Sequence, residues 1–140
     1  MLFTSKPDLD FLNKMGRNTM VEHLGITFTG YGEDYLEAVM PVTDKTKQPL
    51  GLLHGGANVV LAETLGSVAG MLMINPETHY CVGLEINANH LKSVKEGTVK
   101  GIVKPIHIGQ KTQVWEIRIV TPEGKLSCIS RITLAVLEKK

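Results

Sequence analysis

A single carboxylate inside an apolar segment is the feature of this sequence that most directly suggests chemistry. Glu63 lies near the middle of residues 57–74, where the only other polar side chains are Asn58, Thr64 and Ser67. Burying an unpaired charge costs several kcal/mol or forces protonation, so a carboxylate buried at this position predicts a functional role for Glu63. The alternative is a carboxylate that pairs with a structural partner across an interface.

Two glycines stand just ahead of this segment, in the sequence His54-Gly55-Gly56. If a helix starts there, the N–H of Gly55 has no partner within the helix, and the helix dipole favours negative charge beside it. Such a donor stabilises the oxyanion formed when a carbonyl carbon is attacked. With Glu63 two turns along the same helix, the pattern predicts acyl chemistry. A glycine-rich loop needed only for tight packing is the alternative.

Other polar side chains could assist Glu63 as a general base or a nucleophile. Ser67 is four residues after Glu63 and shares its helix face, while Thr64 is turned 100° away; either could orient the carboxylate or a water. Gln48 precedes the helix and could donate to an oxygen or hold a water. His54 could act as an acid, a base or a supporting group. An ordinary loop glutamine and a histidine that only hydrogen-bonds the helix start remain open.

Two predicted strands end in polar and cationic residues. Residues 87–93 close one strand, and residues 107–111 close another. Lys92, Lys95 and Lys111, together with backbone N–H groups, could seat a phosphate-bearing ligand there. Solvated strand ends are the alternative.

The bulk composition excludes several classes of function. The chain has 140 residues, a net charge of +1 and 5% aromatic residues, so we expect one domain over residues 1–140 and no nucleic-acid partner. Cys81 and Cys128 form no CxxC motif and the histidines lack metal-ligand spacing, so we expect no metal and a reduced, cytoplasmic setting. No P-loop or GxGxxG is present, so no nucleotide cofactor is indicated. The N-terminus does not resemble a signal peptide, and Glu63 with the recurring glycines argues against a membrane span.

Hydrophobic periodicity predicts an α+β domain. We expect short helices at residues 7–16 and 19–24, a hairpin of strands 26–31 and 35–42, a loop at 43–53, a long helix at 55–74, and strands at 79–89, 98–108, 112–121 and 125–137. The last four strands have short connections, which predicts antiparallel neighbours. One helix cannot cover both faces of such a sheet, so we expect the sheet to curl around it and another subunit to close an edge or face. Gly66 and Gly70 would let the sheet approach the helix.

The sequence resembles a known enzyme family along nearly its full length. The matching segments are residues 48–56, 62–67, 82–90, 115–117 and 130–132. They resemble the hotdog-fold acyl-CoA thioesterases of the phenylacetate-degradation and 4-hydroxybenzoyl-CoA type, especially the branch that serves menaquinone synthesis. The resemblance implies a hotdog fold, an antiparallel sheet around one long helix, and dimers or dimers of dimers with active sites between subunits.

The resemblance also implies a role for each site residue. Glu63 would be the catalytic carboxylate, and the Gly55 N–H would polarise the thioester carbonyl. Gln48 and His54 would line the reacting centre, and Ser67 would lie beside the carboxylate. The CoA moiety would lie along Gly83, His90, Leu91, Lys92, Ser93, His107, Ile108, Gly109, Gln110, Lys111 and Thr112.

The expected activity is hydrolysis of an aromatic acyl-CoA to the free acid and CoA, with no metal, bound cofactor or membrane partner. Alternatives are a proofreading or broad-range acyl-CoA or acyl-carrier thioesterase, a non-catalytic acyl-binding protein, and an acyl dehydratase. A dehydratase would use a His–Asp or His–Glu pair, which the motif pattern does not match.

Overall fold

Helix α3, Gly55–Met71, is the centre of the structure. The computed structural model describes residues 1–140. His54 caps the start of α3, and the helix passes through an apolar sequence without proline. Its last residue is Met71, three residues before the predicted end at Ile74, and Leu72 is the cap. The chain continues as a turn in which the Met73 N–H donates to the Gly70 carbonyl. No helix is both long and apolar enough to cross a membrane.

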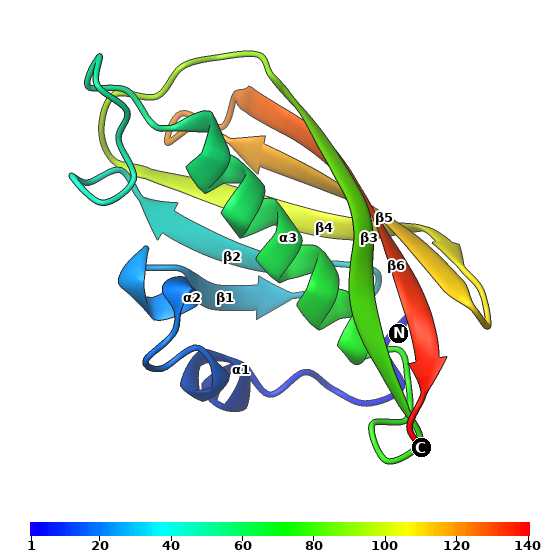
Figure 1. Ribbon diagram of the computed structural model, residues 1–140. Helices are drawn as coiled ribbons and strands as arrows, with labels where there is room; N and C mark the ends of the chain where they lie inside the picture. Colours follow the sequence, from blue (N-terminus) through cyan, green and yellow to red (C-terminus); the bar gives the residue numbers. More distant parts are fainter.

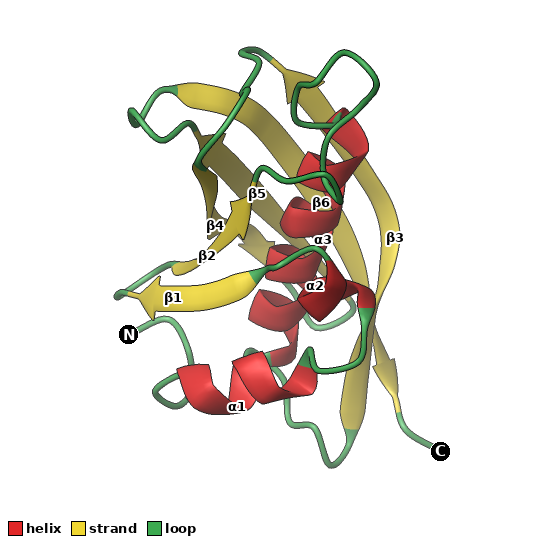
Figure 2. Ribbon diagram, turned by 90° about the vertical axis from the view of Figure 1, so that its left-hand side faces the viewer, coloured by secondary structure: helices red, strands yellow, loops and turns green.

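A six-stranded antiparallel sheet curls around α3 (Figures 1 and 2). Its strands, in spatial order, are β1 (Thr27–Tyr31), β2 (Leu36–Pro41), β4 (Thr98–Ile108), β5 (Thr112–Val120), β6 (Leu126–Glu138) and β3 (His79–His90). The predicted hotdog arrangement of a sheet wrapped around one helix is confirmed. Two short helices, α1 (Leu9–Met15) and α2 (Met20–His23), lie beside β1 and α3.

The neighbours of β3 differ from the sequence prediction. Short connections suggested that β3 pairs with β4, but β3 pairs with β6 at one edge of the sheet, whereas β4 lies between β2 and β5. Residues 91–97 cross the end of the sheet instead of forming a hairpin. Alternation of apolar residues specifies which face of a strand is buried but not which strand lies beside it, so the pattern could not distinguish these arrangements.

The buried face of α3 packs on the sheet through small residues. A Cβ at Gly66 would collide with Ile132, and one at Gly70 would collide with Leu134, so the predicted close approach at these glycines is confirmed. The contact is made by side chains of β6. The indole of Trp115 is fully buried and donates to Oε1 of Gln113 at 2.9 Å. These contacts hold α3 in a fixed position relative to β3, β5 and β6.

The outer edge of β3 is long, and its first half exposes large apolar side chains. The strand runs for 12 residues with no partner on that side, and it exposes the large side chains of Tyr80, Val82 and Leu84, the last 62% exposed. An unpaired edge of this length presents free N–H and C=O groups to any strand that can pair with it.

Candidate active site

The start of α3 leaves one backbone donor free, as the sequence predicted. Nδ1 of His54 accepts the Gly56 N–H at 2.7 Å, and the His54 carbonyl accepts the N–H groups of Ala57 and Asn58. The Gly55 N–H makes no hydrogen bond within the chain. Because the helix dipole adds positive character at this end, Gly55 presents a directed donor for an oxygen that gains negative charge.

A cleft of about 350 Å³ opens beside Gly55, and it brings together several residues that the sequence analysis singled out. Gln48, His90, Lys92 and Ser93 line it. Oε1 of Gln48 accepts the N–H of Leu50, so its Nε2 is left free to donate. A Cβ at position 55 would lie 2.8 Å from Nε2 of His90, so only glycine allows this ring to rest against the helix start. Beside the helix start, the cleft therefore offers the Gly55 N–H and Nε2 of Gln48 as donors.

Glu63 is exposed in the single chain, so the expectation of a buried carboxylate is wrong for one chain alone. The apolar segment suggested burial on every side, but the sheet covers only one side of α3, and Glu63 lies at the margin of that cover, beside the edge strand β3. Its carboxylate reaches β3, where a Cβ at Gly83 would lie 2.9 Å from Oε2. Gly83 thus leaves space for the Glu63 side chain.

The two helix residues expected near Glu63 differ in their hydrogen bonds. The Thr64 hydroxyl donates to the carbonyl of Val60 at 2.7 Å, so its proton is already used within α3. Ser67 is half-buried and its hydroxyl makes no hydrogen bond within the chain. Of the two, Ser67 is the one free to orient a carboxylate or a water.

Gly55 and Glu63 do not meet within one chain. They are eight residues apart on α3, which places them about 12 Å apart along the helix axis at 1.5 Å per residue. Groups that act on one carbonyl must lie within hydrogen-bonding reach of it, roughly 3 Å. One copy of the chain therefore supplies the oxyanion donors and the carboxylate at two separate places.

The predicted CoA-binding segments are also separated. His90–Ser93 lie beside Gly55, but Ile108–Lys111 line a cleft of about 490 Å³ with His79, at the other end of α3. The reason is the direction of β4, which starts near the beginning of α3 and ends near its C-terminus. The single chain therefore holds two half-sites that the sequence analysis treated as one.

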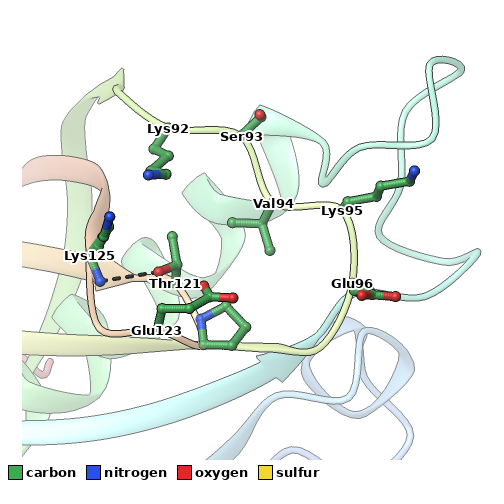
Figure 3. A pocket seen from close by; sticks show the side chains of 9 residues that line it. Lys92, Ser93, Val94, Lys95, Glu96, Thr121, Glu123 and Lys125 are labelled. Carbon is green, nitrogen blue, oxygen red and sulfur yellow. Dashed lines mark hydrogen bonds between the residues drawn. The ribbon is translucent and has the colours of Figure 1, made fainter.

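A third cleft, of about 400 Å³, adjoins the one at Gly55 and shares Lys92, Ser93 and Val94 with it. Figure 3 shows the side chains of Lys92 and Lys125 on the same side of this cleft, with that of Lys95 directed away from them. The two clefts form a continuous surface from Gly55 to this group of lysines. Sequence reasoning missed Lys125, because the residues before it were interpreted only as a turn.

Sequence reasoning also passed over Asn58. It lines the cleft at Gly55, is 4% exposed, and its Oδ1 has no hydrogen-bond partner. The only signal in the sequence was a polar residue in an apolar segment, and Glu63 in the same segment was the residue interpreted as a catalytic group.

The cysteines offer no alternative nucleophile: both are free, and burial raises the pKa of Cys81 and of Cys128.

Comparison with known proteins shows similarity along the whole chain. The thioesterase superfamily profile matches residues 50–128. A 1,4-dihydroxy-2-naphthoyl-CoA hydrolase from Escherichia coli is 54% identical, with 98% of this chain and 100% of that protein aligned. The proofreading thioesterase EntH from Cronobacter sakazakii is 47% identical over 98% of this chain and 99% of its own. A crystal structure of a variant of thioesterase PA1618 from Pseudomonas aeruginosa superimposes with a TM-score of 0.98 at 47% identity, covering 99% of this chain and 100% of the other.

Proposed function

This chain belongs to the thioesterase superfamily, and we propose that it hydrolyses an aromatic acyl-CoA, 1,4-dihydroxy-2-naphthoyl-CoA being the first substrate to test. The observation that carries this proposal is the free N–H of Gly55 beside Gln48 in a cleft at the start of α3. The similarity to the Escherichia coli hydrolase over nearly the whole chain supports the choice of substrate.

The thioester carbonyl oxygen accepts hydrogen bonds from the Gly55 N–H and from Nε2 of Gln48. These donors act most strongly on the tetrahedral oxyanion, and losing one typically lowers the rate by ~10²–10³. The substrate aryl ring then lies toward a second copy of the chain, and the CoA arm follows the surface past Lys92.

Glu63 provides the carboxylate for bond cleavage, by one of two routes. As a general base it takes a proton from water while the water oxygen adds to the thioester carbon. As a nucleophile its oxygen adds to that carbon and forms a mixed anhydride, which water then cleaves. In both routes the carbon–sulfur bond breaks, the sulfur leaves as the CoA thiolate and takes up a proton, and the acid is released.

A second copy of the chain completes the site. We infer that two β3 strands pair edge to edge, because this edge is long and unpaired and exposes Tyr80, Val82 and Leu84. Antiparallel pairing around a two-fold axis places the His90 end of one strand beside the His79 end of the other. The half-site of one copy at Gly55 and His90 then faces the other copy's half-site near His79 and Ile108, and Glu63 of the second copy faces the cleft.

Release of free thiol from a substrate panel tests the proposed function. The panel holds 1,4-dihydroxy-2-naphthoyl-CoA, benzoyl-CoA, an aliphatic acyl-CoA and an aromatic acyl-carrier thioester. We expect turnover with the aromatic CoA thioesters. Faster turnover of the carrier thioester would favour a proofreading role, and no thiol release from any of them would indicate a protein that binds acyl ligands without cleaving them.

The Glu63→Gln variant tests the role of the carboxylate. We expect kcat to fall by ~10²-fold or more with little change in KM, because the carboxylate acts on the reacting carbon. Since Glu63 is exposed and makes no ion pair within the chain, folding stability should not change. Near-native turnover by this variant would refute the mechanism.

A further inference from the structure

Asn58 is the one polar side chain in the buried face of α3. The other buried residues of this helix are alanine, leucine and glycine. Asn58 is 4% exposed, its Oδ1 is enclosed without a hydrogen-bond partner, and its Nδ2 donates to no group in the chain. A buried amide that lacks partners destabilises the folded chain, so its presence on this face calls for a partner from outside the chain.

Several polar groups near Asn58 already have partners. The Ser127 hydroxyl donates to the Lys92 carbonyl at 2.6 Å, and Oε1 of Gln48 accepts from Leu50. The Asn58 backbone N–H is used by the His54 carbonyl. With the Gly55 N–H and Gln48 Nε2 assigned to the thioester carbonyl, the side-chain carboxamide of Asn58 is a further unsatisfied group in the cleft wall.

The chemistry of Asn58 restricts what that molecule carries at this point. An enclosed carbonyl oxygen needs a donor, and the carbonyl and sulfur of a thioester have no hydrogen to donate, nor does an ionised phosphate. A secondary amide has both an N–H and a C=O, so it can satisfy both ends of a carboxamide. In an acyl-CoA, the amide nearest to the reacting carbon is separated from the sulfur by two methylene groups.

The position of Asn58 agrees with this amide. Residues three apart on a helix lie about 5–6 Å from each other, and Asn58 is three residues after Gly55. With the thioester oxygen on the Gly55 N–H, the leaving-group arm passes Asn58 before it reaches the lysines of the adjoining cleft. We propose that Asn58 is a positioning residue that hydrogen-bonds the first amide of the pantetheine arm; this inference rests on the proposed thioester hydrolysis.

Truncated substrates test this role. Benzoyl-CoA and the benzoyl thioester of N-acetylcysteamine keep the amide, and the benzoyl thioester of ethanethiol lacks it. We expect Asn58→Ala to lower kcat/KM for the first two by about tenfold, the effect of one hydrogen bond in an enclosed site, mainly through KM. The ethanethiol thioester should react unchanged, and Asn58→Ser, which restores a donor and an acceptor, should recover part of the loss.

Asn13 provides a matched control. Its Nδ2 donates to the Phe28 carbonyl at 3.1 Å and its Oδ1 accepts the Phe28 N–H at 2.8 Å, far from the cleft. Asn13→Ala should lower the melting temperature and leave the kinetics with all three substrates unchanged. Asn58→Ala should show the reverse: its kinetics change, while its melting temperature is unchanged or higher, because the variant loses a buried amide without partners.

Other outcomes separate this inference from the proposed function. Equal losses with all three thioesters, or a change in dimer dissociation without a loss in kcat/KM, would overturn the role of Asn58. Calorimetric binding of CoA itself needs no turnover: binding that weakens in Asn58→Ala supports the inference even if the wild-type protein cleaves no substrate. Unchanged CoA affinity in that variant would refute it.

Discussion

A mixed dimer of two inactive variants should regain activity if the active site is shared between subunits. Gln48 lies with Gly55 at the start of α3, whereas Glu63 lies about 12 Å further along the helix axis, at 1.5 Å per residue. A carbonyl held by Gly55 and Gln48 of one chain is therefore beyond the reach of the same chain's Glu63. The two variants to combine are Gln48→Ala and Glu63→Gln.

The expected magnitude follows from the symmetry of the pair. In a two-fold dimer each site takes Gln48 from one chain and Glu63 from the other. A dimer of one Gln48→Ala chain and one Glu63→Gln chain has one site with both residues intact and one site with neither. Its activity should be about half that of the wild-type dimer, whereas each parent variant should fall by ~10²-fold.

Co-expression with two different affinity tags yields the mixed dimer after two purification steps, and thiol release from benzoyl-CoA measures its activity. The two parent dimers, each carrying both tags, serve as controls. A mixed dimer no more active than its parents would show that both residues act within one chain, and the separation of the half-sites along α3 would then have no bearing on catalysis.

Two further perturbations follow from the same geometry. Gly55→Ala should lower kcat, because the new Cβ would lie 2.8 Å from Nε2 of His90 and would displace that ring from its place beside the Gly55 N–H. The fold should be preserved, because alanine is a better helix former than glycine by up to about 1 kcal/mol. Unchanged kcat would refute a role for the contact between His90 and Gly55. Leu84→Lys should convert the dimer to a monomer and abolish thiol release, because it places a charge in the proposed β3 interface. Sedimentation velocity measures the oligomeric state, and a variant that remains dimeric would place the interface elsewhere.

The sequence predicted the elements of this fold well because each carries a clear local pattern. Gln113, Trp115, Ile117 and Ile119 alternate along β5, and all four are buried as the period of two requires. The glycines at 55 and 66 likewise marked the helix start and a close contact with the sheet. These features depend on residues that lie near each other in the sequence.

The features that the sequence did not predict depend on distant parts of the chain. No local pattern states that β3 pairs with β6, because that choice depends on how residues 91–97 cross the sheet. Glu63 was expected to be buried because its segment is apolar, but the sheet covers only one side of α3. The sequence predicted no role for Asn58, because its lack of a hydrogen-bond partner depends on the residues that surround it in the cleft wall.

The length of α3 between Gly55 and Glu63 has a consequence for how this enzyme is measured. If neither chain holds a complete set of reacting groups, turnover per milligram is governed by mass action as well as by chemistry. Dilution below the dissociation constant of the pair would then lower the measured rate with no change in any catalytic group. Rates of two variants can be compared only at one common protein concentration, well above the point at which the pairs separate.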